Sequence, residues 1–228
     1  MKTQNIIIAL GILVVIAAII ILTGKPEQKN VEDIVMYDAA SQSSEGILIN
    51  QEPNTTQPPT SMETQQKQYT QAVITTNHGT ITLELYPERA PNTVANFGKL
   101  ASEGFYDGTR FHRVIDGFMI QSGDPQSREE ELMDMWGTGG PGYKFADELP
   151  KAGEYELGSI AMANSGPNTN GSQYFIVSGQ SGVSLPPLYS LFGKVTSGMD
   201  IVDKISQVAT DGRDRPIDDV IVTSISVQ

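Results

Sequence analysis

Residues 111–124 read FHRVIDGFMIQSGD, a stretch that mixes strand-forming apolar residues with a single arginine, Arg113. The pattern predicts two short strands, residues 111–115 and 118–121, followed by a loop. A second stretch, residues 162–176, reads MANSGPNTNGSQYFI and joins a small-polar turn to a further strand-forming run. Both stretches therefore favour short strands linked by polar turns.

Short strands continue on both sides of these stretches. Residues 80–86 alternate apolar and polar side chains, which predicts a half-buried strand forming a hairpin with residues 73–74 across a turn at residues 77–79. Further strands are predicted at residues 159–163, 174–177, 191–195 and 220–227. Only two helices are predicted, one opened by Pro91 and one over residues 198–208. This pattern indicates a mainly β fold, a closed antiparallel barrel with helical caps.

The composition excludes several classes of function. The chain has 228 residues, of which 27 are acidic and 15 basic, and its formal net charge is −12. An acidic balance argues against a nucleic-acid binder, which needs clustered Lys and Arg. No cysteine is present, which excludes disulfide scaffolds, Cys-ligated zinc and a Cys nucleophile, and two histidines leave little for a metal site.

The N-terminal 24 residues are predicted to form a membrane anchor. Residues 6–22 are an uncharged apolar run that would span roughly 26 Å as a helix, close to the thickness of a bilayer core. A cleaved signal peptide is the main alternative, and a buried core helix is another. Lys25, Pro26 and Glu27 follow directly where a small-x-small cleavage site would be expected, which favours a retained anchor. The short tail ahead of the run favours a C-terminal domain outside the cytoplasm.

Residues 25–68 are rich in Gln, Ser, Thr, Glu and Pro and bury too little apolar area to fold. They are predicted to form a flexible linker to a single domain over residues 69–228. Within that domain, residues 137–142 match the dinucleotide pattern G-x-G-x-x-G, but no apolar strand precedes them and Pro141 lies inside. They are therefore interpreted as a turn. His112, inside a strand-like run, is interpreted as a hydrogen-bonded structural histidine rather than a catalytic base.

The two stretches above, followed by LPPLYSLFGKV at residues 185–195 and GMDIV at residues 198–202, resemble the cyclophilin family of peptidyl-prolyl isomerases in order and spacing. The resemblance covers roughly residue 72 to the C-terminus. It implies an eight-stranded antiparallel barrel capped by two helices, and an enzyme that catalyses cis/trans rotation about X–Pro bonds. No bond is broken in that reaction, so no metal or cofactor is implied.

The resemblance also implies the roles of site residues. Arg113 is the catalytic arginine, whose guanidinium donates toward the prolyl amide, and Gln121 and Gln173 orient it and the peptide. Four residues match the proline pocket, although each taken singly would be assigned to the core: Phe118, Met119, Phe175 and Leu185. The remaining substrate contacts are Ala163, Asn164, Tyr189 and, in a supporting role, His112.

The chain departs from the family pattern at several positions. Ser184 stands where many eukaryotic relatives carry Trp, and this change predicts weak cyclosporin binding. Tyr189 stands where they often carry His, and Ser122 replaces a Gly. Residues 126–136 form an unusually long acidic insertion. Its capping-box pattern predicts a helical turn with Ser127 as N-cap, with Leu132, Met133 and Trp136 on one face and Trp136 packed on the barrel.

Taken together, the sequence predicts a membrane-tethered prolyl isomerase that assists the folding of proline-containing polypeptides. A non-catalytic peptide-binding module with the same groove is the main alternative, and a scaffold domain is a third. The expected partners are polypeptide clients and the membrane, with no nucleic acid, and the expected state is a monomer.

Overall fold

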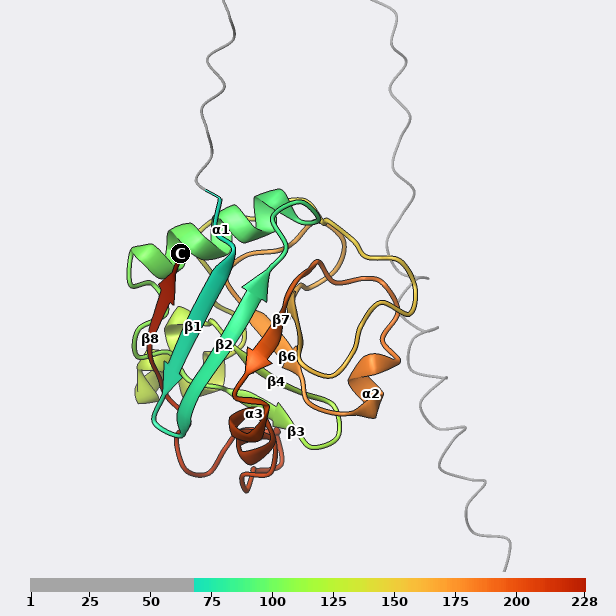
Figure 1. Cartoon of the computed structure of the whole chain (residues 1–228). Coiled ribbons are helices and arrows are strands. Elements are labelled where there is room, and N and C mark those ends of the chain that lie inside the picture. The colour runs from blue at the N-terminus through green and yellow to red at the C-terminus, as the bar shows by residue number, and fades with distance from the viewer. Residues whose placement is uncertain (1–67) are drawn as a thin grey trace, which may run out of the picture. The chain divides into compact units, whose positions relative to one another are not determined.

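The computed structural model describes residues 68–228, drawn in colour in Figure 1. The anchor and linker predicted at residues 1–24 and 25–68 lie outside the described residues, apart from the last linker residue. In the described part of the chain, no helix is long and apolar enough to cross a membrane.

Eight antiparallel strands form one sheet, and this number confirms the expectation. Their order across the sheet is β3-β4-β6-β5-β7-β2-β1-β8. The strands are β1 (Gln71–Thr76), β2 (Gly79–Leu85), β3 (Arg113–Ile115), β4 (Met119–Ser122), β5 (Ser159–Met162), β6 (Tyr174–Val177), β7 (Leu191–Ser197) and β8 (Val222–Val227). The sheet curls, and a bridge between Arg110 and Ile221 links the segments that precede β3 and β8.

Two helices lie at opposite ends of the strands (Figure 1), as predicted. Helix α1 (Pro91–Ser102) starts with proline at its first turn and buries Val94, Phe97 and Ala101, which the sequence pattern placed on one face. The carboxylate of Glu148 accepts hydrogen bonds from the backbone N–H groups of Asn92 and Thr93, so an acidic group from a distant loop caps the positive end of the helix. Helix α3 (Met199–Ser206) buries Val202 and Ile205.

Three local expectations were wrong. A third short helix, α2 (Gln180–Val183), was not predicted, because four residues carry no readable periodicity. His112 lies just before β3 rather than inside a strand. The insertion forms two 3-10 helices, η1 (Pro125–Arg128) and η2 (Glu130–Met135), which are N-capped by Asp124 and Glu129 and not by Ser127.

The insertion also faces solvent more than expected. Leu132 and Met133 are exposed, because a 3-10 helix has three residues per turn and does not align positions four apart on one face. Trp136 is half-buried and does pack on the domain, with the guanidinium of Arg110 5.2 Å from its ring centroid. Its Nε1–H donates to the backbone oxygen of Glu129 at 3.0 Å, which fixes the end of the insertion.

The apolar residues of the domain form two clusters on the two faces of the sheet. The larger is the interior core and includes Ile120, Ile160, Tyr174, Ile176 and Phe192. The smaller contains Met119, Tyr155, Ala161, Phe175, Val177 and Leu191. Strands β4, β5 and β6 are therefore apolar on both faces, because their side chains alternate between the two clusters.

Candidate active site

A cavity of about 170 Å³ lies over the smaller cluster and gathers nine of the eleven predicted site residues. Its lining consists of Arg113, Phe118, Met119, Gln121, Ala163, Asn164, Phe175, Leu185 and Tyr189. Strand register brings Arg113, Gln121 and Phe175 together. Arg113 on β3 pairs with Gln121 on β4, and Gln121 pairs with Phe175 on β6. Directly paired residues point to the same face of a sheet, so these three form one row.

The apolar part of the cavity is a slot for a small ring. Met119 and Phe175 form its floor and are nearly fully buried. Tyr189 stands edge-on to the ring of Phe175, with centroids 5.4 Å apart and ring planes at 90°. The backbone around Tyr189 is held by Tyr155, whose hydroxyl donates to Tyr189 O at 2.7 Å and accepts from Tyr189 N at 3.1 Å. The slot therefore has rigid walls before any ligand enters.

Arg113 supplies the positive charge at the edge of the slot. Its side chain is 45% exposed, and its Nε lies 3.8 Å from a carboxylate oxygen of Asp214. Its Nη1 donates to Gln121 Oε1 at 3.5 Å. Gln121 Nε2 in turn donates to Gln173 Oε1 at 2.9 Å. The arginine thus has two partners, and its side chain remains 45% exposed.

The side chain of Asn164 links the slot to the neighbouring loops through two hydrogen bonds. Its Nδ2 donates to Leu188 O at 2.9 Å, and its Oδ1 accepts from Gly166 N at 3.2 Å. These bonds use the side chain to fix the loop before Tyr189. Asn164 and Ala163 border both the slot and a second cavity.

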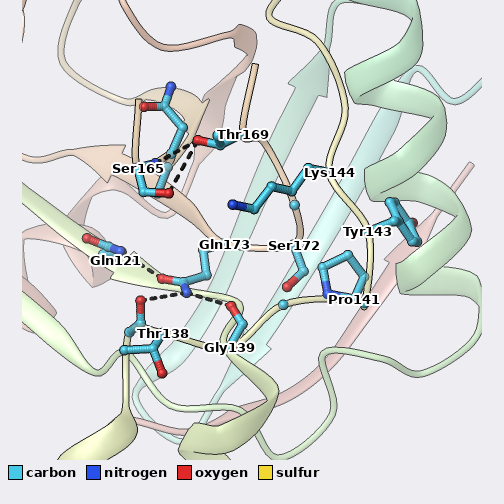
Figure 2. A pocket seen from close by; sticks show the side chains of 16 residues that line it. Gln121, Thr138, Gly139, Pro141, Tyr143, Lys144, Ser165, Thr169, Ser172 and Gln173 are labelled. Carbon is cyan, nitrogen blue, oxygen red and sulfur yellow. Dashed lines mark hydrogen bonds between the residues drawn. The ribbon is translucent and has the colours of Figure 1, made fainter. Parts of the chain in front are cut away.

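The second cavity, of about 770 Å³, has both polar and apolar groups in its lining and adjoins the slot through Gln121, Ala163 and Asn164. Figure 2 shows its lining, with the amide of Gln173 between Gln121 and Gly139 and with Lys144, Ser165 and Thr169 around the opening. Residues 137–142, which the sequence analysis interprets as a turn and not as a dinucleotide-binding motif, form one wall of this cavity. A chain bound in the slot has room here for a neighbouring residue. Sequence reasoning did not identify Lys144, Ser165 or Thr169, because isolated polar loop residues carry no pattern.

His112 does not line the slot. It is 4% exposed and borders a third cavity of about 340 Å³, between the insertion and the loop that carries Arg213 and Arg215. Burial lowers the pKa of His112 below its usual value of about 6.5, and the negative charge of Asp124 opposes this effect. The imidazole is therefore a buried group beside the site. The hydrogen bonding predicted for it is not found, since neither ring nitrogen has a hydrogen-bond partner among residues 68–228.

The fold accommodates Ser122, which departs from the family pattern, but has no room for a side chain at the adjacent Gly123. The buried Ser122 hydroxyl donates to Arg110 O at 3.0 Å, so the added polar group is satisfied. The adjacent Gly123 has φ +89°, and a Cβ there would stand 2.4 Å from the backbone oxygen of Ser172. Position 123 therefore requires glycine for both conformation and space.

Comparisons with known proteins were made on the sequence and on the fold. Residues 71–227 match the family model described as cyclophilin type peptidyl-prolyl cis-trans isomerase/CLD. The chain is 44% identical over 174 residues to peptidyl-prolyl cis-trans isomerase A of Mycobacterium tuberculosis, covering 68% of this chain and 91% of that protein. It is 43% identical over 176 residues to peptidyl-prolyl cis-trans isomerase B of Streptomyces anulatus, covering 69% and 95%.

The fold comparison agrees with the sequence comparison. A crystal structure of a Cryptosporidium parvum cyclophilin type peptidyl-prolyl cis-trans isomerase matches with a TM-score of 0.63 and 34% identity, covering 71% of this chain and 98% of that one. The chain belongs to the cyclophilin-type peptidyl-prolyl cis-trans isomerase family. Its activity is therefore cis/trans isomerisation of X–Pro peptide bonds, as the motifs at residues 111–124 and 162–176 implied.

The buried imidazole makes folding stability depend on pH. Because the folded-state pKa of His112 is lowered, the unfolded state binds more protons just below pH about 6.5, and the free energy of unfolding falls as pH falls through this range. We expect His112→Gln, which cannot titrate, to show a shallower dependence. Urea unfolding of both proteins at about pH 5.5 and about pH 7.5 measures it. Equal slopes for the two proteins would show that His112 does not contribute.

Proposed function

We propose that this isomerase binds the prolyl ring of an unfolded polypeptide in the slot over Met119 and Phe175 and promotes rotation through Arg113. The observation that carries the proposal is the row formed by Arg113, Gln121 and Phe175, which sets a fixed cation at the edge of an apolar slot. The substrates are proline-containing polypeptides. The physiological role is assistance of folding, in which X–Pro rotation is a slow step.

The mechanism follows from the electronic structure of the amide. The uncatalysed barrier of about 18–20 kcal/mol arises from delocalisation of the prolyl nitrogen lone pair into the carbonyl. In the twisted transition state this lone pair is localised on nitrogen and accepts a hydrogen bond. A guanidinium N–H of Arg113 directed at that nitrogen stabilises the twisted state more than either planar state, which lowers the barrier.

The other site residues hold one side of the rotating bond. The ring is immobilised by Phe118, Met119, Phe175 and Leu185, and Tyr189 closes the slot. Polar groups of Gln121 and Asn164 at the rim can hold the backbone on the same side of the bond as the ring. Rotation about the bond then moves the free side while the held side stays in place.

A non-catalytic peptide-binding module is the alternative for a cyclophilin fold, and Arg113 discriminates between the two. Binding requires only the slot and the polar rim, whereas rotation requires a donor to the prolyl nitrogen. Arg113 is present, half-exposed at the slot and oriented by Gln121. These contacts favour the catalytic function.

We expect Arg113→Ala to lower kcat/KM for an Ala-Pro peptide by roughly 10²-fold, on the order of 3 kcal/mol of transition-state stabilisation. The circular dichroism spectrum should not change, because the side chain is half-exposed. Arg89→Ala, which removes a surface arginine paired with Glu154, is the matched control and should retain activity. An active, folded Arg113→Ala protein would remove Arg113 from the mechanism.

We propose weak binding of cyclosporin. Ser184 ends α2 and is exposed, and its hydroxyl donates to Gln180 O at 3.3 Å, so the position offers no aromatic surface. Loss of such an anchor typically costs about 2 kcal/mol of binding free energy. Calorimetric titration should therefore give weak binding for the wild type and tighter binding for Ser184→Trp. Tight binding by the wild type would contradict this expectation.

We further propose that the domain is tethered to a membrane and works outside the cytoplasm, as a monomer without nucleic-acid partners. The support is the uncharged run at residues 6–22 and the polar segment that follows it. The protein should remain with the membrane fraction after a high-salt wash, and a reporter fused after Gln228 should be active outside the cytoplasm. Release of a shortened soluble protein would instead indicate a cleaved signal peptide.

A further inference from the structure

Asp124 is a buried carboxylate that belongs to none of the site roles given above. It is 0% exposed, and none of the ion pairs found among residues 68–228 involves it. Backbone N–H groups satisfy it instead. Its Oδ1 accepts from Gln126 N at 2.8 Å, and its Oδ2 accepts from Gly139 N at 3.1 Å and from Gly137 N. Three backbone donors thus converge on the two carboxyl oxygens.

The two glycines that donate to Asp124 also carry the carbonyls that hold Gln173. Gln173 Nε2 donates to Gly137 O at 3.0 Å and to Gly139 O at 2.8 Å, as Figure 2 shows for the amide beside Gly139. Both amide hydrogens of Gln173 are therefore committed to the turn. Its Oε1 is left to face Gln121, and this fixes which way round the Gln173 amide lies.

The orientation of the Gln173 amide determines that of Gln121 and its contact with Arg113. Gln121 Nε2 donates to Gln173 Oε1 at 2.9 Å, so Gln121 Oε1 is directed to the other side, where Arg113 Nη1 donates to it at 3.5 Å. Each amide in this series has a donor end and an acceptor end. Reversing one would place donor against donor at the next contact. The polarity set at the turn is thereby transmitted to the guanidinium.

The turn is shaped to let the carboxylate approach. A Cβ at Gly139 would stand 2.2 Å from Asp124 Oδ1, whereas a Cβ at Gly212 would meet nothing within 4 Å. Neither glycine has a φ in the left-handed region, so conformation does not require glycine at either position. At position 139 the requirement comes from the carboxylate, and Gly212, which lines none of the three cavities described above, provides the control.

We propose that Asp124 is a positioning residue for catalysis, which acts on Arg113 through the Gly137–Gly139 turn, Gln173 and Gln121. This proposal rests on the proposed role of Arg113. It assigns a part in the reaction to the N-cap of η1, which lies just ahead of the insertion and does not line the slot. The buried carboxylate sets the direction of the hydrogen bonds, and the two glutamines carry it to the guanidinium.

The test uses the full chain and three variants in an Ala-Pro isomerisation assay. Asp124→Asn places an amide N–H₂ against backbone donors, and Gly139→Ala displaces the carboxylate. Both should lower kcat about tenfold or more with little change in KM, because a misplaced arginine weakens only the transition state. Gly212→Ala should be as active as the wild type. The side-chain amide NMR signals of Gln121 and Gln173 should shift in the first two variants only.

A double-mutant cycle separates positioning from a structural effect. In an Arg113→Ala background, Asp124→Asn should cause no further loss, because the group it orients is absent. Equal losses in both backgrounds, or full activity of a folded Gly139→Ala protein, would overturn the proposal. If Asp124→Asn does not fold, the comparison of Gly139→Ala with Gly212→Ala decides. Wild-type activity of Arg113→Ala would reject the proposed role of Arg113 in catalysis. Loss of activity in Arg113→Ala together with full activity in Gly139→Ala would reject only the role of Asp124.

Discussion

The register between β4 and β6 is the constraint on which the rest of the site depends. Ile120 pairs with Ile176 and points into the interior core, while Met119 pairs with Val177 and Gln121 with Phe175 on the opposite face. The outer face of these strands is therefore the floor of the slot. A slip of one residue would exchange the two faces, sending Phe175 inward and Ile176 outward. The interior core thus enforces the site, because burying both isoleucines leaves only one register for the slot.

The same register extends across five strands. Arg113, Gln121, Phe175, Ala161 and Leu191 are successive pairing partners on β3, β4, β6, β5 and β7. The row changes from charged to polar to aromatic to aliphatic along its length. A prolyl peptide needs this sequence of surfaces, because its amide is polar and its ring is apolar. One row of a rigid sheet therefore supplies both the slot and the group that acts on the bond, with little movement required.

Beyond the sheet, the site depends on loops that the sheet does not position. The Gly137–Gly139 turn, the loop at Asn164 and the segment before Tyr189 are held by hydrogen bonds to the buried groups Asp124 and Tyr155 and to the backbone at Leu188. Two of these anchors, Asp124 and Tyr155, lie behind the surface that a substrate would contact. This arrangement explains how a site made largely from turns keeps a defined geometry.

Sequence alone predicted the strands and the two main helices, because alternation at residues 80–86 and the spacing of Val94 and Phe97 follow directly from burial on one face. It did not reveal which way Phe175 points, since β6 is apolar on both faces and reads as a continuous run. Only the resemblance to a family assigned Phe175 to a pocket.

The insertion marks the other limit of sequence reasoning. A helical periodicity was assumed for Leu132, Met133 and Trp136, and the 3-10 geometry separates them. The role of Asp124 has no local signal either. Its partners Gly137 and Gly139 are 13 and 15 residues away, and an Asp before Pro reads as an ordinary turn residue.

The most direct test of the central account is NMR exchange spectroscopy of an Ala-Pro peptide in the presence of a small amount of the full chain. If the slot and Arg113 act together, cis/trans exchange of the peptide is accelerated while the cis/trans ratio stays unchanged, as a catalyst requires. If the peptide signals broaden on binding and the exchange rate stays at its uncatalysed value, the domain binds prolyl peptides without isomerising them, and the account of the site is contradicted.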